Sequence, residues 1–83
     1  MSNTVLDERT RSLVAREADA LLQHARFLRG VDKEAIAVNA EERYRGIIIA
    51  LEYIDSDLAN ELRSELREYL DDVEAGEAVW HAD

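Results

Sequence analysis

Apolar residues recur at helical spacing in three segments of the chain, and these segments define its expected helices. The first contains five apolar positions at alternating intervals of four and three residues: Val14, Ala18, Leu21, Ala25 and Leu28. Such intervals place the side chains on one face of a helix. The pattern predicts a helix over about residues 5–29, with Thr4 as its N-cap and Gly30 just after its end.

The second helix is expected over about residues 40–54, after a connector at 31–38 that is compatible with a short connecting helix. Its start signal is a capping box, in which the side chain of Asn39 accepts from the amide of Glu42 and the Glu42 carboxylate reaches back. The expected core face is Tyr44, Ile47, Ala50, Leu51 and Ile54. A β-strand over 47–54 is the alternative, because consecutive isoleucines suit a sheet, but no other segment has comparable β character to pair with it.

The third helix is expected over about residues 57–75, followed by Gly76 as C-cap and a tail at 77–83. Its apolar stripe is Leu58, Leu62, Leu66, Tyr69, Leu70 and Val73. The absence of proline and the presence of only three glycines also favour helix. Together the segments predict an all-α fold, a small antiparallel bundle of three main helices that forms a single domain over residues 1–83.

The net charge of -9 argues against direct binding of nucleic acid, which is held mainly by basic groups on its phosphates. The charge is concentrated at one end of the chain, since residues 55–83 carry ten acids and two bases whereas residues 1–30 carry four acids and five bases. No apolar run reaches the ~18 residues of a membrane span, and acids stand where a signal peptide carries bases. With no cysteine, the expected location is the cytoplasm.

Five carboxylates of the third helix are spaced to form a ridge beside its apolar stripe: Asp57, Glu61, Glu65, Glu68 and Asp72. Like charges at these intervals repel one another, and acids near a helix C-terminus oppose the dipole, so helix stability does not explain the ridge. Three interpretations stay open. The ridge keeps a small protein soluble, it binds a basic partner, or it reflects adaptation to high salt, for which nine arginines against one lysine are a further sign.

The second helix carries more apolar surface than a three-helix bundle readily buries. Ile48, Ile49 and Tyr53 lie on or beside the face opposite the expected core. This surplus favours a homodimer formed through that helix, and the alternative is a central helix buried within one chain. Trp80, beyond the last helix, either packs back onto the bundle or anchors an interface.

Known catalytic, cofactor-binding and metal-binding patterns do not occur in the sequence. The glycines are too far apart for a phosphate loop, and neither His24 nor His81 has a second histidine four residues away. The segment around His24 also departs from a histidine-phosphotransfer helix, in which a basic residue and a glycine occupy the positions held here by Phe27 and Leu28. We therefore expect a protein that is not an enzyme and that requires no cofactor or metal.

The function most consistent with this charge distribution is the binding and blocking of a basic protein surface by the acidic ridge. A small inhibitor of a nucleic-acid-binding protein, of the kind that phages or toxin–antitoxin systems encode, is the most concrete form of this hypothesis. The alternative is a homodimeric scaffolding module whose acidity serves solubility or salt adaptation.

Overall fold

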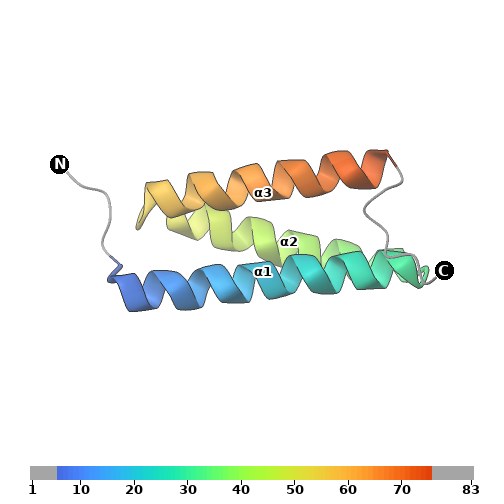
Figure 1. Ribbon diagram of the computed structural model, residues 1–83, viewed down its shortest axis with the longest axis horizontal. Coiled ribbons are helices and arrows are strands. Elements are labelled where there is room, and N and C mark those ends of the chain that lie inside the picture. The colour runs from blue at the N-terminus through green and yellow to red at the C-terminus, as the bar shows by residue number, and fades with distance from the viewer. Residues whose placement is uncertain (1–5, 76–83) are drawn as a thin grey trace.

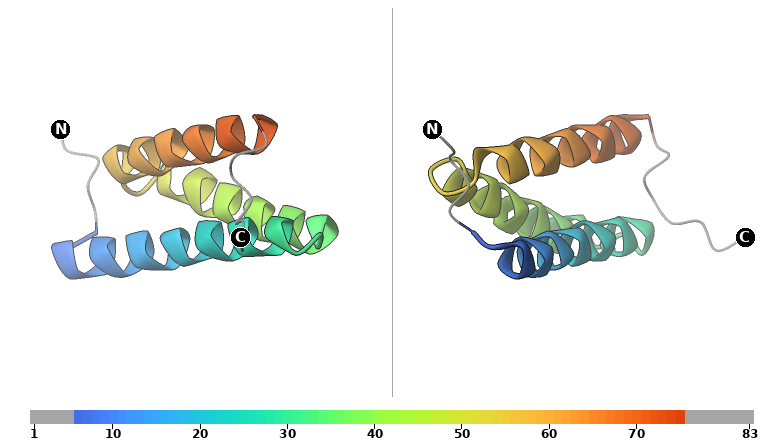
Figure 2. Two further views of the ribbon diagram at one scale, coloured as in Figure 1. Left: turned by 45° about the vertical axis from the view of Figure 1, so that its right-hand side comes forward. Right: turned by 60° about the vertical axis from the view of Figure 1, so that its left-hand side comes forward.

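A computed structural model describes residues 6–75 as three helices, which confirms the all-α prediction (Figure 1). They are α1 (Glu8–Gly30), α2 (Glu34–Leu51) and α3 (Ser56–Glu74). The chain turns back at each connection, and α2 packs against both α1 and α3 (Figures 1 and 2). No strand occurs within residues 6–75, so the β-strand interpretation of residues 47–54 is wrong.

The first helix begins later than its apolar pattern suggests. Its N-cap is Asp7, whose side chain accepts a 2.7 Å hydrogen bond from the amide of Thr10. The predicted cap, Thr4, lies outside the described residues. The helix ends at Gly30, and Asp32 in the following turn has a φ of 61°, a left-handed conformation that aspartate tolerates better than most residues.

The start of the second helix was predicted wrongly. Helix α2 begins at Glu34. The carbonyl oxygen of Lys33 accepts hydrogen bonds from the backbone amides of Ile36 and Ala37, at N···O distances of 3.1 and 3.0 Å. Asn39 therefore lies inside the helix instead of capping it, and no separate connecting helix is present within residues 6–75. The turn at Asp32 ends α1 shortly before α2 begins, so the predicted connector supplies the first turns of α2.

The third helix starts where the sequence indicates a turn. Asp55 is its N-cap and accepts a 3.2 Å hydrogen bond from the amide of Leu58. The helix ends at Glu74 with Ala75 as the C-cap, and the predicted cap Gly76 lies outside the described residues. The predicted start at residue 57 was thus correct to within one residue of the observed start at Ser56.

The core forms where the apolar stripes of the three helices meet. It is made of Ala18, Leu22, Ala25, Ala40, Tyr44, Ile48, Leu51, Leu58, Ala59, Leu62, Leu66 and Tyr69. The stripe of α3 is confirmed, with Leu70 and Val73 partly buried at its edge. The core face predicted for the second helix was only partly right. Ala50 is exposed, Ile54 is exposed beyond the end of α2 at Leu51, and Ile48, which was not in the predicted core, is buried. The buried sector of α2 is rotated toward Ile48 because this helix packs against α3 as well as α1.

Candidate binding surface

The acidic residues in the middle of α3 lie on the flank of that helix that faces α1. Glu61 and Glu65 line a cavity of about 460 Å³ with Ala15, Leu58, Leu62 and Ser64. Glu65 also lines a second cavity of about 160 Å³, together with Asp19, Leu22, Gln23, Arg26 and Glu68. Glu65 borders both cavities, so they lie next to one another between α1 and α3, and we call them together the acidic groove.

The acidic groove combines an apolar floor with a charged rim. Leu22 and Leu62 are buried beneath it, whereas Glu61, Glu65 and Glu68 are exposed above them. Of the three helix pairs, α1 and α3 make the least contact with one another. A groove of this composition suits a ligand with both apolar and basic groups.

The charge at the two ends of the ridge is partly neutralised by arginines of α1. At one end Asp72 is half-buried and lies 3.6 Å from the guanidinium of Arg26, which also stands 5.2 Å from the centre of the Tyr69 ring. At the other end Arg11 has a raised pKa, chiefly because it is hydrogen-bonded to Asp55, and the charges of nearby Glu61 and Asp57 contribute. The part of the ridge that lacks an ion pair within residues 6–75 is therefore its middle.

Glu61, Glu65 and Glu68 form no ion pair within 4 Å in the part of the chain that the structure describes. Their surroundings add further negative charge from Asp19 of α1. Burial raises the pKa of the Tyr44 hydroxyl, and the charges of Glu65 and Asp19 raise it further. The ridge therefore faces an acid of the neighbouring helix across the groove.

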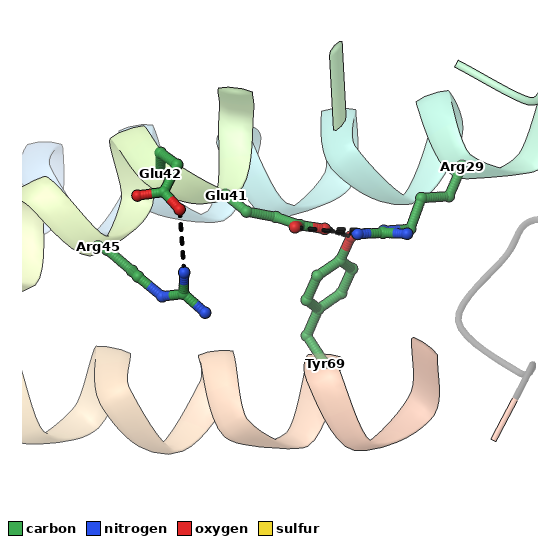
Figure 3. Close-up of polar contacts among 5 residues, drawn as sticks. All are labelled: Arg29, Glu41, Glu42, Arg45 and Tyr69. Atoms are coloured by element: carbon green, nitrogen blue, oxygen red, sulfur yellow. Dashed lines mark hydrogen bonds and ion pairs between the residues drawn. The ribbon is translucent and has the colours of Figure 1, made fainter. Parts of the chain in front are cut away.

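A polar network beneath the surface joins all three helices (Figure 3). Arg29 of α1 donates two hydrogen bonds to the carboxylate of Glu41 of α2, at 2.8 and 3.0 Å. Tyr69 of α3 donates to the same carboxylate at 2.6 Å and accepts from Arg29 at 3.2 Å. This network ties α3 to both α1 and α2.

Ionisation in this network is governed by two opposing effects. Burial by itself raises the pKa of Glu41, but the hydrogen bonds from Arg29 and Tyr69 outweigh burial, and the pKa lies below its usual value. Burial and the hydrogen bond to Glu41 raise the pKa of Tyr69 to about 12. At neutral pH the network is thus a carboxylate held between a guanidinium and a neutral phenol.

A second long-range ion pair fixes the other end of the bundle. Arg11 of α1 donates to Asp55 at 2.5 Å, and Asp55 has no exposed surface. Burial alone would raise the pKa of this carboxyl, but the bonds from Arg11 and from the Leu58 amide lower it. The two ion pairs, Arg11–Asp55 and Arg29–Glu41, therefore link α1 to the rest of the chain near both of its ends.

Sequence reasoning missed the polar network, although one signal for it exists. Glu41 lies three residues before Tyr44 and seven before Ile48, on the same helix face as these buried residues. A charged residue within an apolar stripe indicates a buried partner. The choice of Arg29 as that partner depends on how the helices pack, and the sequence does not contain that information.

Of the predicted dimer-interface residues that the structure describes, Ile48 is buried whereas Ile49 and Tyr53 are exposed. Ile48 is 5% exposed and belongs to the core of the single chain, so it is not free to contact a partner. Ile49 and Tyr53 are 59% and 86% exposed. Trp80 lies outside the described residues.

The metal-ligating side chains of residues 6–75 do not gather into a metal site. These residues contain no group of three or more histidine, cysteine or acidic side chains arranged to hold a metal ion. His24 is exposed and lines a shallow cavity between α1 and α2 with Leu21, Ile36, Asn39, Ala40 and Arg43. None of the three helices is long and apolar enough to cross a membrane.

Comparison of the chain with protein-family models, with curated proteins and with solved structures finds no match. The function of this chain is therefore inferred from the charge, burial and lining residues of the acidic groove.

Proposed function

We propose that this protein, without catalysing a reaction, binds a basic surface of another protein in the acidic groove and blocks that surface. The observation that carries the proposal is the arrangement of Glu61, Glu65 and Glu68. Their carboxylates stand, without an ion pair among residues 6–75, on the rim of a groove whose floor is apolar. Uncompensated charge above buried leucines is suited to an amphipathic partner, because one ligand can use both features.

The partner that fits this groove best is an amphipathic helix with basic residues along one side. Apolar side chains of such a helix would lie over the half-buried Ala15 and the edges of the buried leucines, while its lysines or arginines would pair with the carboxylates. Helix-in-groove binding of this kind uses side chains at intervals of three and four residues. The partner's basic side would then no longer be available to phosphate, which is why a nucleic-acid-binding protein is the most concrete target.

Charge spacing supports an apolar contribution to binding. Successive carboxylates on the ridge are separated by about 5 to 6 Å along α3, at a rise of about 1.5 Å per residue. Duplex DNA carries one charge per about 1.7 Å of its axis. The ridge of one chain is thus a sparse substitute for DNA, and we propose that the apolar floor provides the remaining affinity.

Neutralising the rim tests this function. For the triple variant Glu61→Gln, Glu65→Gln and Glu68→Gln, we expect at least tenfold weaker binding of an 18-residue amphipathic Leu/Lys helical peptide, measured by titration calorimetry at 0.15 M salt. Loss of three favourable charge pairs at about 0.5 to 1 kcal/mol each accounts for a change of this size.

The matched control removes the same charge outside the groove. Glu34, Asp71 and Glu74 are exposed and line neither cavity, and their amide variants together change the net charge equally. This control is expected to weaken binding by less than threefold. Equal weakening by the two triple variants would mean that the peptide responds to bulk charge, and the groove would lose its assigned role.

A second candidate is a homodimeric scaffolding module, in which two small antiparallel bundles associate. The observation that favours it is apolar surface left exposed on the α1–α2 side of the chain, including Leu13 and Ile36.

A further inference from the structure

A second groove lies on the side of the molecule that α1 and α2 form without α3. Its wider part, of about 340 Å³, is lined by Leu13, Val14, Glu17, Ile47, Ala50 and Leu51. Further along the same two helices lies the shallow cavity that contains His24 and Arg43. We call these two cavities together the α1–α2 face. Glu17 is the only acid and Arg43 the only arginine or lysine among the side chains that line them.

We infer that the α1–α2 face is a two-fold symmetric interface with a second copy of this chain. The inference is independent of the basic partner proposed above, because that partner occupies the opposite flank of α1. It also replaces the interface expected from the sequence, since Ile48 is buried and neither Ile49 nor Tyr53 lines either cavity.

The distribution of charge selects a second copy as the occupant of this face. Helix α3 has seven acids and two bases, whereas α1 has three acids and five bases and α2 has three acids and two bases. Two copies that meet through α1 and α2 keep their acidic α3 helices on the far sides of the dimer. A basic partner would instead be drawn to α3. The helices that form the face are together nearly neutral, with six acids and seven bases, so two copies do not repel each other at this contact.

The two charges on this face are placed so that it is complementary to itself. Glu17 lies on the α1 wall beside Ile47 and Ala50, and Arg43 lies on the α2 wall beside Leu21 and His24, about one helical turn further along. A two-fold axis that lies in the plane of the face, midway between the two residues and perpendicular to the line that joins them, brings each Glu17 over the partner's Arg43. Both side chains are exposed, and neither forms an ion pair within residues 6–75.

The apolar surface of the face is consistent with an isologous contact. Leu13 and Ile36, near opposite ends of it, are 52% and 50% exposed. In a two-fold dimer, the Leu13 end of each chain lies over the Ile36 end of its partner, so both exposed side chains are covered. Gly46 lies on the exposed side of α2 near this face, and a methyl group at that position would meet nothing within 4 Å. Packing within one chain therefore does not require a glycine at this position.

A charge-swap experiment tests the inference, with the mass of the full chain in solution measured by sedimentation equilibrium. The wild-type chain is expected to be a dimer at 100 µM. Glu17→Arg places two arginines against each other at each contact, and Arg43→Glu places two glutamates against each other. Each variant alone is expected to dimerise at least tenfold more weakly.

An equimolar mixture of the two variants is expected to recover the dimer. In the mixed dimer, one contact keeps the native pair of Glu17 and Arg43, one residue from each chain. In the other contact, the arginine introduced at position 17 of one chain faces the glutamate introduced at position 43 of its partner. Both contacts therefore join opposite charges, which neither variant achieves alone.

Two control variants change the charge equally on the solvent side of α3. Asp71→Arg and Arg67→Glu alter exposed positions that line none of the cavities described, and both are expected to dimerise like the wild type. A wild-type mass of 9.5 kDa at 100 µM would overturn the inference. So would a pair of weakened variants whose mixture stays monomeric, and so would single variants that dimerise normally. Binding of the basic peptide by Glu17→Arg reports on the acidic groove separately.

Discussion

Replacing Arg29 by alanine is expected to lower the free energy of unfolding by about 3 kcal/mol, because it removes one partner from a largely buried ion pair. The side chains of Arg29 and Glu41 are 17% and 7% exposed, and the carboxylate would keep only its bond from Tyr69. The residual exposure of the arginine places the expected loss at the lower end of values for buried pairs. Urea unfolding followed by circular dichroism measures the change.

The chain supplies a matched control for this prediction one helical turn away (Figure 3). Arg45 and Glu42 of α2 form a 3.1 Å ion pair between exposed side chains. Arg45→Ala is expected to change the free energy of unfolding by at most about 0.5 kcal/mol, as is usual for surface pairs. If Arg29→Ala were as mild as Arg45→Ala, the three-helix network would not hold α3 in place.

Replacing Leu62 by alanine is expected to cost about 3 kcal/mol of stability, within the range for leucine truncation in protein cores. Leu62 is 2% exposed, lies in the middle of α3 and packs into the shared core beneath the acidic groove. Its carbonyl also accepts a 3.0 Å hydrogen bond from Tyr44, which ties this part of α3 to α2. Thermal and urea unfolding of the variant measure the loss.

Ile49→Ala is the control for the leucine truncation, because Ile49 is 59% exposed. The change in its free energy of unfolding is expected to stay within about 0.5 kcal/mol. A loss of several kcal/mol at Ile49 would show that this side chain is covered in solution, which would favour the interface first expected from the sequence. Comparable losses at the two positions would contradict the assignment of Leu62 to the core and of Ile49 to the surface.

The buried face of α3 was predictable because this helix has a single apolar stripe, and that stripe faces the core. Its apolar positions recur without interruption from Leu58 to Tyr69, and its predicted start at residue 57 is one residue from the observed start at Ser56. Helix α2 was harder, because it packs against two neighbours and its buried sector is wide. Asn39 looked like a cap, yet the amide and carboxylate chemistry of a capping box is equally compatible with an exposed stretch inside a helix.

The candidate site was predictable in part for a similar reason. The positions of Glu61, Glu65 and Glu68 on one flank of α3 follow from helical periodicity alone. Periodicity does not show that α1 lies beside that flank, that Asp19 adds to its charge, or that Arg26 pairs with Asp72. Those features depend on how the helices pack. The acidic groove exists only because α1 lies beside the ridge of α3.

The most direct test of the acidic groove is an NMR titration of the ¹⁵N-labelled chain with the Leu/Lys helical peptide. Binding in the groove predicts that the largest amide shifts occur at Asp19 and Gln23 of α1 and at Glu61, Glu65 and Glu68 of α3. A peptide with the same composition but a scrambled order, which lacks an apolar face, is expected to cause much smaller shifts. Shifts of equal size for both peptides, or shifts concentrated on the α1–α2 face, would contradict the proposal that the acidic groove binds a basic partner.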